Sequence, residues 1–164
     1  QYHEKKEPKE YPVDAALGLN LINYLIENGF DISQSTNLPK SRGEGHAFGF
    51  VHRRLLINKK TPVVPIILNT YYPPNQPSAH RCRVLGQTHR AAVEKNGDKK
   101  RIGVIASGGL RHFLIDETLD NKVLAGCRSH DGKMLLTIPS KKLVSGNSEI
   151  RNWIALDGAS ERLK

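Results

Sequence analysis

A histidine that follows a pair of glycines is the most informative chemical feature of this sequence. The largely apolar segment 101–106 leads through Ser107 into Gly108 and Gly109, and His112 comes three residues later. Glycines let the backbone turn sharply at the carboxyl end of a strand, which is where open α/β sheets usually assemble their ligand sites. His112 is therefore the first candidate for a catalytic side chain.

His46 is the second candidate histidine, because it also follows a glycine-bearing turn and precedes apolar and aromatic residues. The sequence has seven histidines and none of them forms His-x-x-x-His or another compact metal pair, so the pattern alone does not build a metal site. The other five are more typical of surface positions or satisfied core positions: His3, His52, His80, His89 and His130.

Glu149 has two possible roles. It lies in the first turn of an expected helix, where a negative side chain complements the helix dipole. It becomes a credible metal ligand only with imidazole partners, because a lone carboxylate binds ferrous iron weakly and without selectivity. Ser107 does not lie in Gly-x-Ser-x-Gly, and the glycines after it lack the dinucleotide and Walker spacings. A serine hydrolase and a nucleotide-binding loop are therefore disfavoured.

Composition is ordinary for one globular domain, apart from the charge. The 164 residues are 38% hydrophobic and 25% charged, with 25 Lys and Arg against 16 Asp and Glu, a net charge of +9. The basic residues form small dispersed clusters without interleaved aromatics, which favours solvated loops over a nucleic-acid surface and also suits an anionic small substrate. No apolar stretch approaches the ~20 residues of a membrane span, so we expect a cytoplasmic protein. Cys82 and Cys127 form no Cys-x-x-Cys unit, and we expect both to be reduced.

The apolar pattern predicts helices that alternate with extended segments behind a polar lead-in of residues 1–12. Asp14 is placed to cap the first helix and Asn28-Gly29 to end it. We expect helices over 14–28, 46–56, 78–95, 116–125, 139–144 and from 147 or 148, and strands over 30–33, 63–68 and 101–106. These elements predict a single α/β domain over 13–164, with a central, mostly buried sheet flanked by helices.

Four motifs stand in a fixed order along most of the chain. They are Gly45-His46-Ala47-Phe48; Val64-Pro65-Ile66 followed by Pro73-Pro74 and Ser78-Ala79-His80-Arg81-Cys82-Arg83-Val84-Leu85-Gly86; Ile105-Ala106-Ser107-Gly108-Gly109-Leu110-Arg111-His112; and Gly146-Asn147-Ser148-Glu149-Ile150-Arg151-Asn152-Trp153. Together they resemble the class III extradiol ring-cleavage dioxygenases, of the protocatechuate 4,5-dioxygenase catalytic-subunit and gallate dioxygenase type.

The resemblance implies a non-haem ferrous ion, Fe(2+), held by two histidines and one glutamate, with open positions for a catechol and O2. It matches Glu149 to the metal-binding glutamate, His112 to the acid/base histidine, and His46 to a further active-site histidine near the substrate. The family's two ligand histidines precede all four motifs, so residues 13–164 correspond to the C-terminal part of the catalytic domain. The missing ligands would come from upstream residues or another polypeptide, unless catalysis has been lost.

The implied reaction is extradiol (meta) cleavage of a catecholic aromatic acid. A catechol must lose protons to chelate a metal, and an imidazole with an unperturbed pKa of about 6.5 can accept one and return it. Relatives assemble as homodimers or with a small helical subunit, and we expect the same here. The alternative is a non-catalytic basic domain that binds an anionic partner or another subunit.

Overall fold

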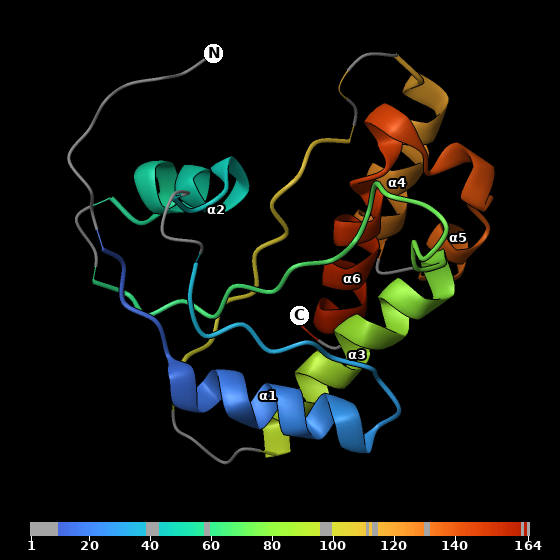
Figure 1. Cartoon of the computed structure of the whole chain (residues 1–164). Coiled ribbons are helices and arrows are strands. Elements are labelled where there is room, and N and C mark those ends of the chain that lie inside the picture. Colours follow the sequence, from blue (N-terminus) through green and yellow to red (C-terminus); the bar gives the residue numbers. More distant parts are fainter. Residues whose placement is uncertain are drawn as a thin grey trace.

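Helices make up most of the described structure (Figure 1). The computed structural model describes residues 10–38, 43–57, 60–95, 100–110, 112, 115–129, 132–161 and 163. The α-helices are α1 (Ala15–Glu27), α2 (His46–Phe50), α3 (Ala79–Lys95), α4 (Glu117–Ser129), α5 (Gly132–Leu136) and α6 (Ile150–Ser160). A π-helical turn continues α2 over Val51–Leu55, and 3-10 turns cover Ser140–Lys142 and Ser145–Asn147.

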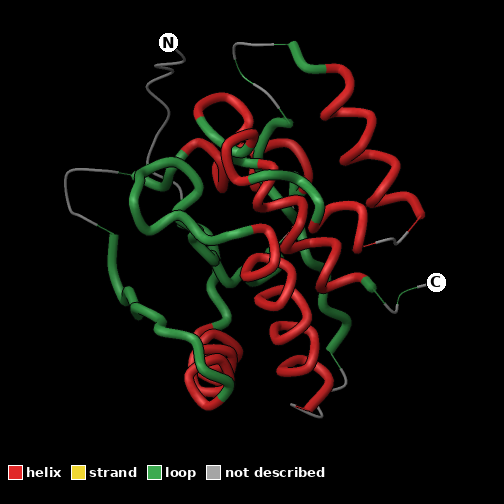
Figure 2. Tube along the Cα trace, turned by 90° about the vertical axis from the view of Figure 1, so that its right-hand side faces the viewer, coloured by secondary structure: helices red, strands yellow, loops and turns green. Residues whose placement is uncertain are grey.

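The expectation of an α/β fold with a central sheet is wrong. In the described part of the chain the structure has no strand, and Figure 2 draws only helices and loops. Among the residues that the structure describes, one parallel bridge joins Val13 to Val63, where the Val63 N–H donates to the carbonyl of Pro12 at 3.0 Å. The apolar segments 63–68 and 101–106 form no ladder with each other, and 30–33 also lies in a loop. Their composition favours an extended backbone, but a sheet also requires a neighbouring backbone in register.

Local sequence signals place α1 correctly. The Asp14 carboxylate accepts a hydrogen bond from the Leu17 N–H at 3.0 Å, which satisfies one of the free donors at the helix start. The helix ends at Glu27, and Gly29 follows in the left-handed region with φ +78°. Leu21 and Leu25 are buried on one face, as the spacing predicted.

The other helices follow the predicted segments with shifted ends. α2 and its π-helical turn occupy the segment predicted over 46–56, and the 3-10 turn at 140–142 lies within the segment predicted over 139–144. α4 begins at Glu117 behind an Asp116 cap but continues four residues beyond the predicted end, and α5 was not expected. The predicted stop of α3 at Asn96-Gly97-Asp98 and most of the polar lead-in, residues 1–9, lie outside the described residues.

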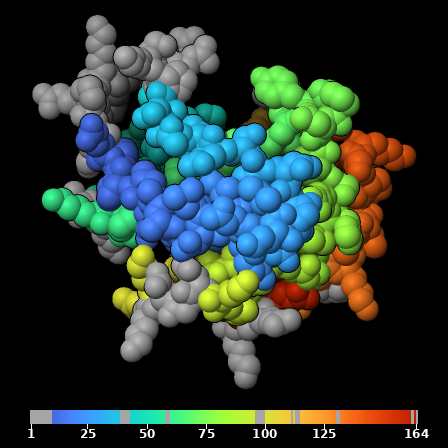
Figure 3. All heavy atoms as spheres, turned by 60° about the horizontal axis from the view of Figure 1, so that its bottom comes forward, coloured from blue at the N-terminus to red at the C-terminus, as the bar shows by residue number. Residues whose placement is uncertain are grey.

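Helices α3 and α6 pack together at the centre of the molecule. Gly86 of α3 and Gly158 of α6 allow the close approach: a Cβ at Gly86 would lie 1.9 Å from the Ala155 carbonyl oxygen, and one at Gly158 would lie 2.2 Å from the Arg83 carbonyl oxygen. Ile150 and Ile154 of α6 are fully buried in the main core cluster. Helix α1 covers α3 from the other side and crosses the middle of the face in Figure 3. The N-terminal end of α6 is therefore held on a well-packed helix.

None of the helices in the described ranges combines the length and apolar character needed to cross a membrane.

Candidate active site

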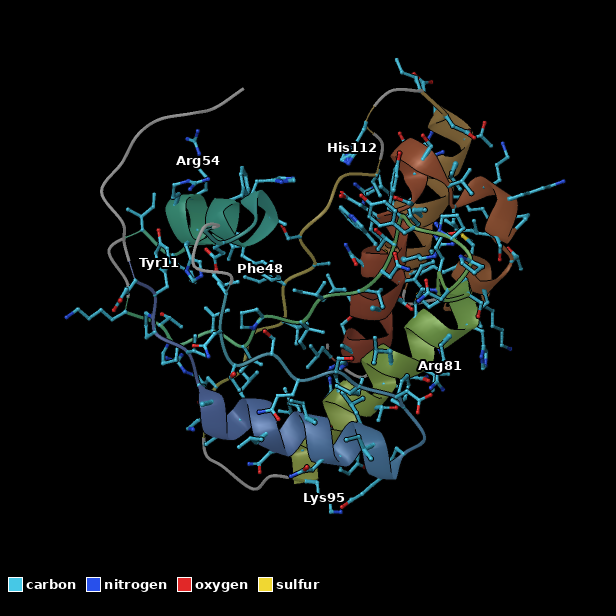
Figure 4. The ribbon with its side chains drawn as sticks, in the orientation of Figure 1. Tyr11, Phe48, Arg54, Arg81, Lys95 and His112 are labelled. Atoms are coloured by element: carbon cyan, nitrogen blue, oxygen red, sulfur yellow. The ribbon has the colours of Figure 1, made fainter. Side chains whose placement is uncertain are left out.

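Glu149 and His112 meet at the N-terminal end of α6. The Nε2 atom of His112 lies 3.1 Å from Oε2 of Glu149, although the residues are 37 positions apart. The Gly109 N–H donates to the same carboxylate oxygen at 2.8 Å. The two side chains are partly exposed, at 38% for His112 and 29% for Glu149, so a small molecule can reach both. Figure 4 shows His112 at the upper end of the extended segment that begins at residue 100.

Two further side chains of α6 bind the segment that contains Gly109, residues 107–109, which we call the turn. The Asn152 amide donates to the Ser107 carbonyl at 3.1 Å, and the Trp153 indole N–H donates to the Gly108 carbonyl at 3.0 Å. With Glu149, these residues have the i, i+3, i+4 spacing that places side chains on one helix face. Sequence reasoning did not single out Asn152 or Trp153, although this spacing in the fourth motif was the available signal.

Gly108 lies so close to α6 that only a glycine fits without movement. A Cβ at this position would lie 2.9 Å from Oε2 of Glu149, 3.0 Å from its Cβ and 3.1 Å from Nδ2 of Asn152. Since the Glu149 Cβ is attached directly to the helix backbone, it cannot rotate out of the way. The first glycine of the pair therefore serves close approach of the turn to the carboxylate.

Arg151 anchors this end of α6 from beneath. Its side chain is buried, and its guanidinium donates to the carbonyls of Pro77 at 2.7 Å and Thr70 at 3.1 Å, and also to that of Leu143. Burial lowers the pKa of Arg151 from its ordinary value, because the charged form loses water. Several carbonyl dipoles replace that hydration, so the residue fixes the helix start against the loop of residues 69–77.

His46 does not join the pair. It is exposed at the start of α2, and within the described residues no hydrogen bond links its side chain to Glu149 or His112. The connection between α2 and the turn runs through Ser107, whose hydroxyl donates to the Ala47 carbonyl at 2.8 Å. The structure thus brings two of the three candidate residues together and leaves the third on a neighbouring element.

Two of the remaining histidines, His52 and His89, are held by contacts with neighbouring residues. His52 is buried, stacks on Tyr11 with ring centroids 3.8 Å apart, and places Nε2 3.2 Å from a Glu44 carboxylate oxygen. His89 Nδ1 lies 2.8 Å from the Leu85 carbonyl in α3. His80 is exposed in the first turn of α3, while His3 and His130 lie outside the described residues.

The described residues fit one position of a three-ligand metal site. Both hydrogen bonds to the Glu149 carboxylate involve Oε2. Within the described part of the chain, Oε1 is therefore available to coordinate a metal ion. A carboxylate oxygen together with imidazole nitrogens is the donor set of non-haem iron oxygenases. No group of three or more His, Cys, Asp or Glu side chains converges in the described ranges. A three-ligand site built on Glu149 would therefore need ligands from outside these ranges.

Comparisons with known proteins agree on one family. Residues 5–161 match the model described as the catalytic LigB subunit of aromatic ring-opening dioxygenase. A curated relative, the 2,3-dihydroxyphenylpropionate/2,3-dihydroxicinnamic acid 1,2-dioxygenase of Azotobacter vinelandii (strain DJ / ATCC BAA-1303), is 32% identical over 105 residues. This match covers 64% of the chain and 31% of the relative, so it spans about a third of that protein's length. No solved structure matches the chain significantly.

Proposed function

The chain belongs to the family of catalytic LigB subunits of aromatic ring-opening dioxygenases, and we propose that it carries part of the active site of an Fe(2+)-dependent extradiol dioxygenase. The observation that carries this proposal is the contact between Glu149 and His112, since each occupies a position that the family motifs match to a functional role. The remaining metal ligands lie outside the described residues.

The substrate we propose is a catechol that bears a carboxylate. The curated relative is named for two dihydroxylated aromatic acids, which supports this class. The net charge of +9 on this chain suits an anionic substrate, because a positive surface attracts it over a distance of several ångströms. We propose a homodimer or a complex with a small helical subunit as the working assembly.

Glu149 is the proposed metal ligand of this chain, through Oε1. Its other oxygen is held by the Gly109 N–H and by His112, so the carboxylate has a fixed orientation. A bound ferrous ion supplies the redox-active Lewis acid at which the catechol and O2 are brought together. The contribution of this chain is to present one oxygen donor in a set direction.

His112 is the proposed acid/base residue. It accepts a proton from a catechol hydroxyl as the diol binds and later returns a proton to the opening ring. In its protonated state, the ring donates an N–H to Oε2 of Glu149, 3.1 Å from Nε2. His46 on α2 is the proposed second proton-transfer residue beside the substrate, and the Ser107 hydroxyl ties its helix to the turn.

The test compares three variants in the longest native polypeptide that contains this chain. We expect His112→Ala to lower kcat by about 10²–10⁴-fold with iron content unchanged, and Glu149→Gln to lose iron. His80→Ala is the matched control, because His80 is exposed on α3, and it should retain activity. The readouts are absorbance of the ring-opened product with 2,3-dihydroxyphenylpropionate or protocatechuate, and iron per protein.

Wild-type turnover in His112→Ala would overturn the acid/base role. An intact protein that takes up no iron and binds no catechol, but binds nucleic acid with a steep salt dependence, would instead identify the non-catalytic basic domain.

A further inference from the structure

Three successive residues of the turn, 107–109, each have a backbone polar group bound by a different side chain of α6 or of the residue that precedes it. The Ser107 carbonyl accepts from Asn152 at 3.1 Å, the Gly108 carbonyl accepts from Trp153 at 3.0 Å, and the Gly109 N–H donates to Glu149 at 2.8 Å. The first two bonds do not involve the carboxylate. They hold the Ser107 and Gly108 carbonyls, and the Gly108 carbonyl belongs to the same peptide group as the Gly109 N–H.

The turn is restricted in both directions relative to α6. The space between the turn and the helix is small, because a Cβ added at Gly108 would lie only 3.0 Å from the Cβ of Glu149 and the glycine places only a hydrogen there. The turn cannot move away without lengthening the hydrogen bonds from Asn152 and Trp153. The helix itself is a firm base, since Ile150 and Ile154 are fully buried in the core. The direction of the Gly109 N–H is therefore set by side chains that do not touch it.

We propose that Asn152 and Trp153 are positioning residues that aim the Gly109 N–H at Oε2 of Glu149, and that this bond turns Oε1 toward the metal. The proposal rests on the proposed function of Glu149 as a ligand. Partners that orient a metal ligand typically contribute 10–100-fold in metal affinity. Without the two bonds to the turn, the Gly109 N–H would hold Oε2 less firmly, the carboxylate would be less restricted about its last side-chain bond, and its average affinity for the metal would fall.

Substitutions at Asn152 and at Trp153, the single tryptophan of the chain, test the positioning role. Trp153→Phe removes the indole N–H and keeps an aromatic ring, while Asn152→Ala removes the amide. Asn121→Ala is the matched control, since Asn121 lies exposed on α4. The first readout is amide hydrogen exchange at Gly109 by NMR on the metal-free chain, with the core amides of Val123 and Ile154 as internal references.

We expect exchange at Gly109 to accelerate at least about tenfold in both variants, with no change at the core references and none in the control. The second readout is the dissociation constant for Fe(2+) alone, measured anaerobically in the polypeptide that supplies the other ligands. We expect it to rise about 10–100-fold in both variants and to stay constant in Asn121→Ala.

Unchanged exchange at Gly109 in both variants would overturn the positioning role. Accelerated exchange with unchanged iron affinity would also overturn it, because the turn would then move without affecting the ligand. Glu149→Gln separates this failure from failure of the proposed function: if that variant binds iron as tightly as the wild type, Glu149 is not a ligand, whatever happens at Gly109. Loss of core protection in Trp153→Phe and Asn152→Ala would mean general unfolding rather than repositioning, and would refute the specific role proposed.

Discussion

Substitution of Gly86 by alanine tests whether the α3–α6 contact supports the site. A Cβ at Gly86 would lie 1.9 Å from the carbonyl oxygen of Ala155 and 2.7 Å from the amide nitrogen of Ala159. Both atoms belong to the backbone of α6, so no side-chain rotation relieves the overlap. The two helices must separate, and α6 carries Glu149 and Trp153 at or near its start.

The cost follows from the size of the overlap. A carbon and a carbonyl oxygen come no closer than roughly 3.3 Å without repulsion, so the 1.9 Å separation must increase by about 1.4 Å. Overpacking a core costs about 1–3 kcal/mol, and a backbone clash belongs at the upper end. Alanine in place of glycine within a helix returns about 1 kcal/mol. A net loss of about 2 kcal/mol in unfolding free energy corresponds to a fall in Tm of about 4–8 °C for a domain of this size.

Urea and thermal unfolding measure this loss, with Gly103→Ala as the matched control. Gly103 has no atom within 4 Å of the position of its Cβ, so that substitution should be neutral or slightly stabilising. Trp153 fluorescence supplies a second readout, because displacement of α6 alters the indole contact with Gly108. An unfolding free energy for Gly86→Ala equal to or above that of Gly103→Ala would refute the packing argument.

Three further predictions concern ionisable groups. Burial raises the pKa of Cys82 to about 11, so iodoacetamide at pH 8 should alkylate Cys82 far more slowly than the partly exposed Cys127. Mass spectrometry of the native chain measures the two rates. Equal rates would contradict the buried position of Cys82. Burial lowers the pKa of His89 below its ordinary 6.5, so as pH drops below about 6.5 the unfolded state takes up a proton before the folded state does, and stability falls. The unfolding free energy should therefore depend less steeply on pH on the acid side in His89→Gln than in the wild type. An identical slope in the two proteins would contradict the lowered pKa of His89. A hydrogen bond from the Leu119 N–H, and to a smaller extent one from Lys142, lowers the pKa of Asp116, so the contribution of Asp116 to stability is present above pH 3.8 and is lost as pH falls through the lowered value. Asp116→Asn should weaken this pH dependence in acid titrations followed by circular dichroism. Titration curves identical to those of the wild type would exclude a contribution from Asp116.

Helices were predictable here because their signals are local. Asp14 and Gly29 mark the two ends of α1 within a few residues of the helix they bound, and Leu21 and Leu25 show its buried face. The absence of a sheet among the described residues was not predictable in the same way. Residues 63–68 have the composition of a buried strand, but Ile67 is 81% exposed, because pairing depends on a distant backbone that composition does not specify.

The candidate site was predictable only as far as motif resemblance reaches. Glu149 and His112 were chosen from separate motifs, and their contact depends on how the turn meets α6, which no local pattern encodes. Arg151 illustrates the limit: a charged residue in a helix suggests an exposed position, yet it is buried because three carbonyls from two other segments surround its guanidinium. Asn152 and Trp153 were visible in the sequence, but their role depends on the same tertiary contact.

The missing sheet changes how the position of His112 must be explained. In the predicted fold, hydrogen bonds between strands would hold the segment 101–106 and so fix the turn that follows it. In the structure, this segment has no such bonds among the described residues, and Val104 and Ile105 are 53% and 51% exposed. The side chains of α6 therefore hold the turn in place of a ladder. Because α6 is packed through Gly86 and anchored by Arg151, the distance between His112 and Glu149 is set by the helical core rather than by a strand.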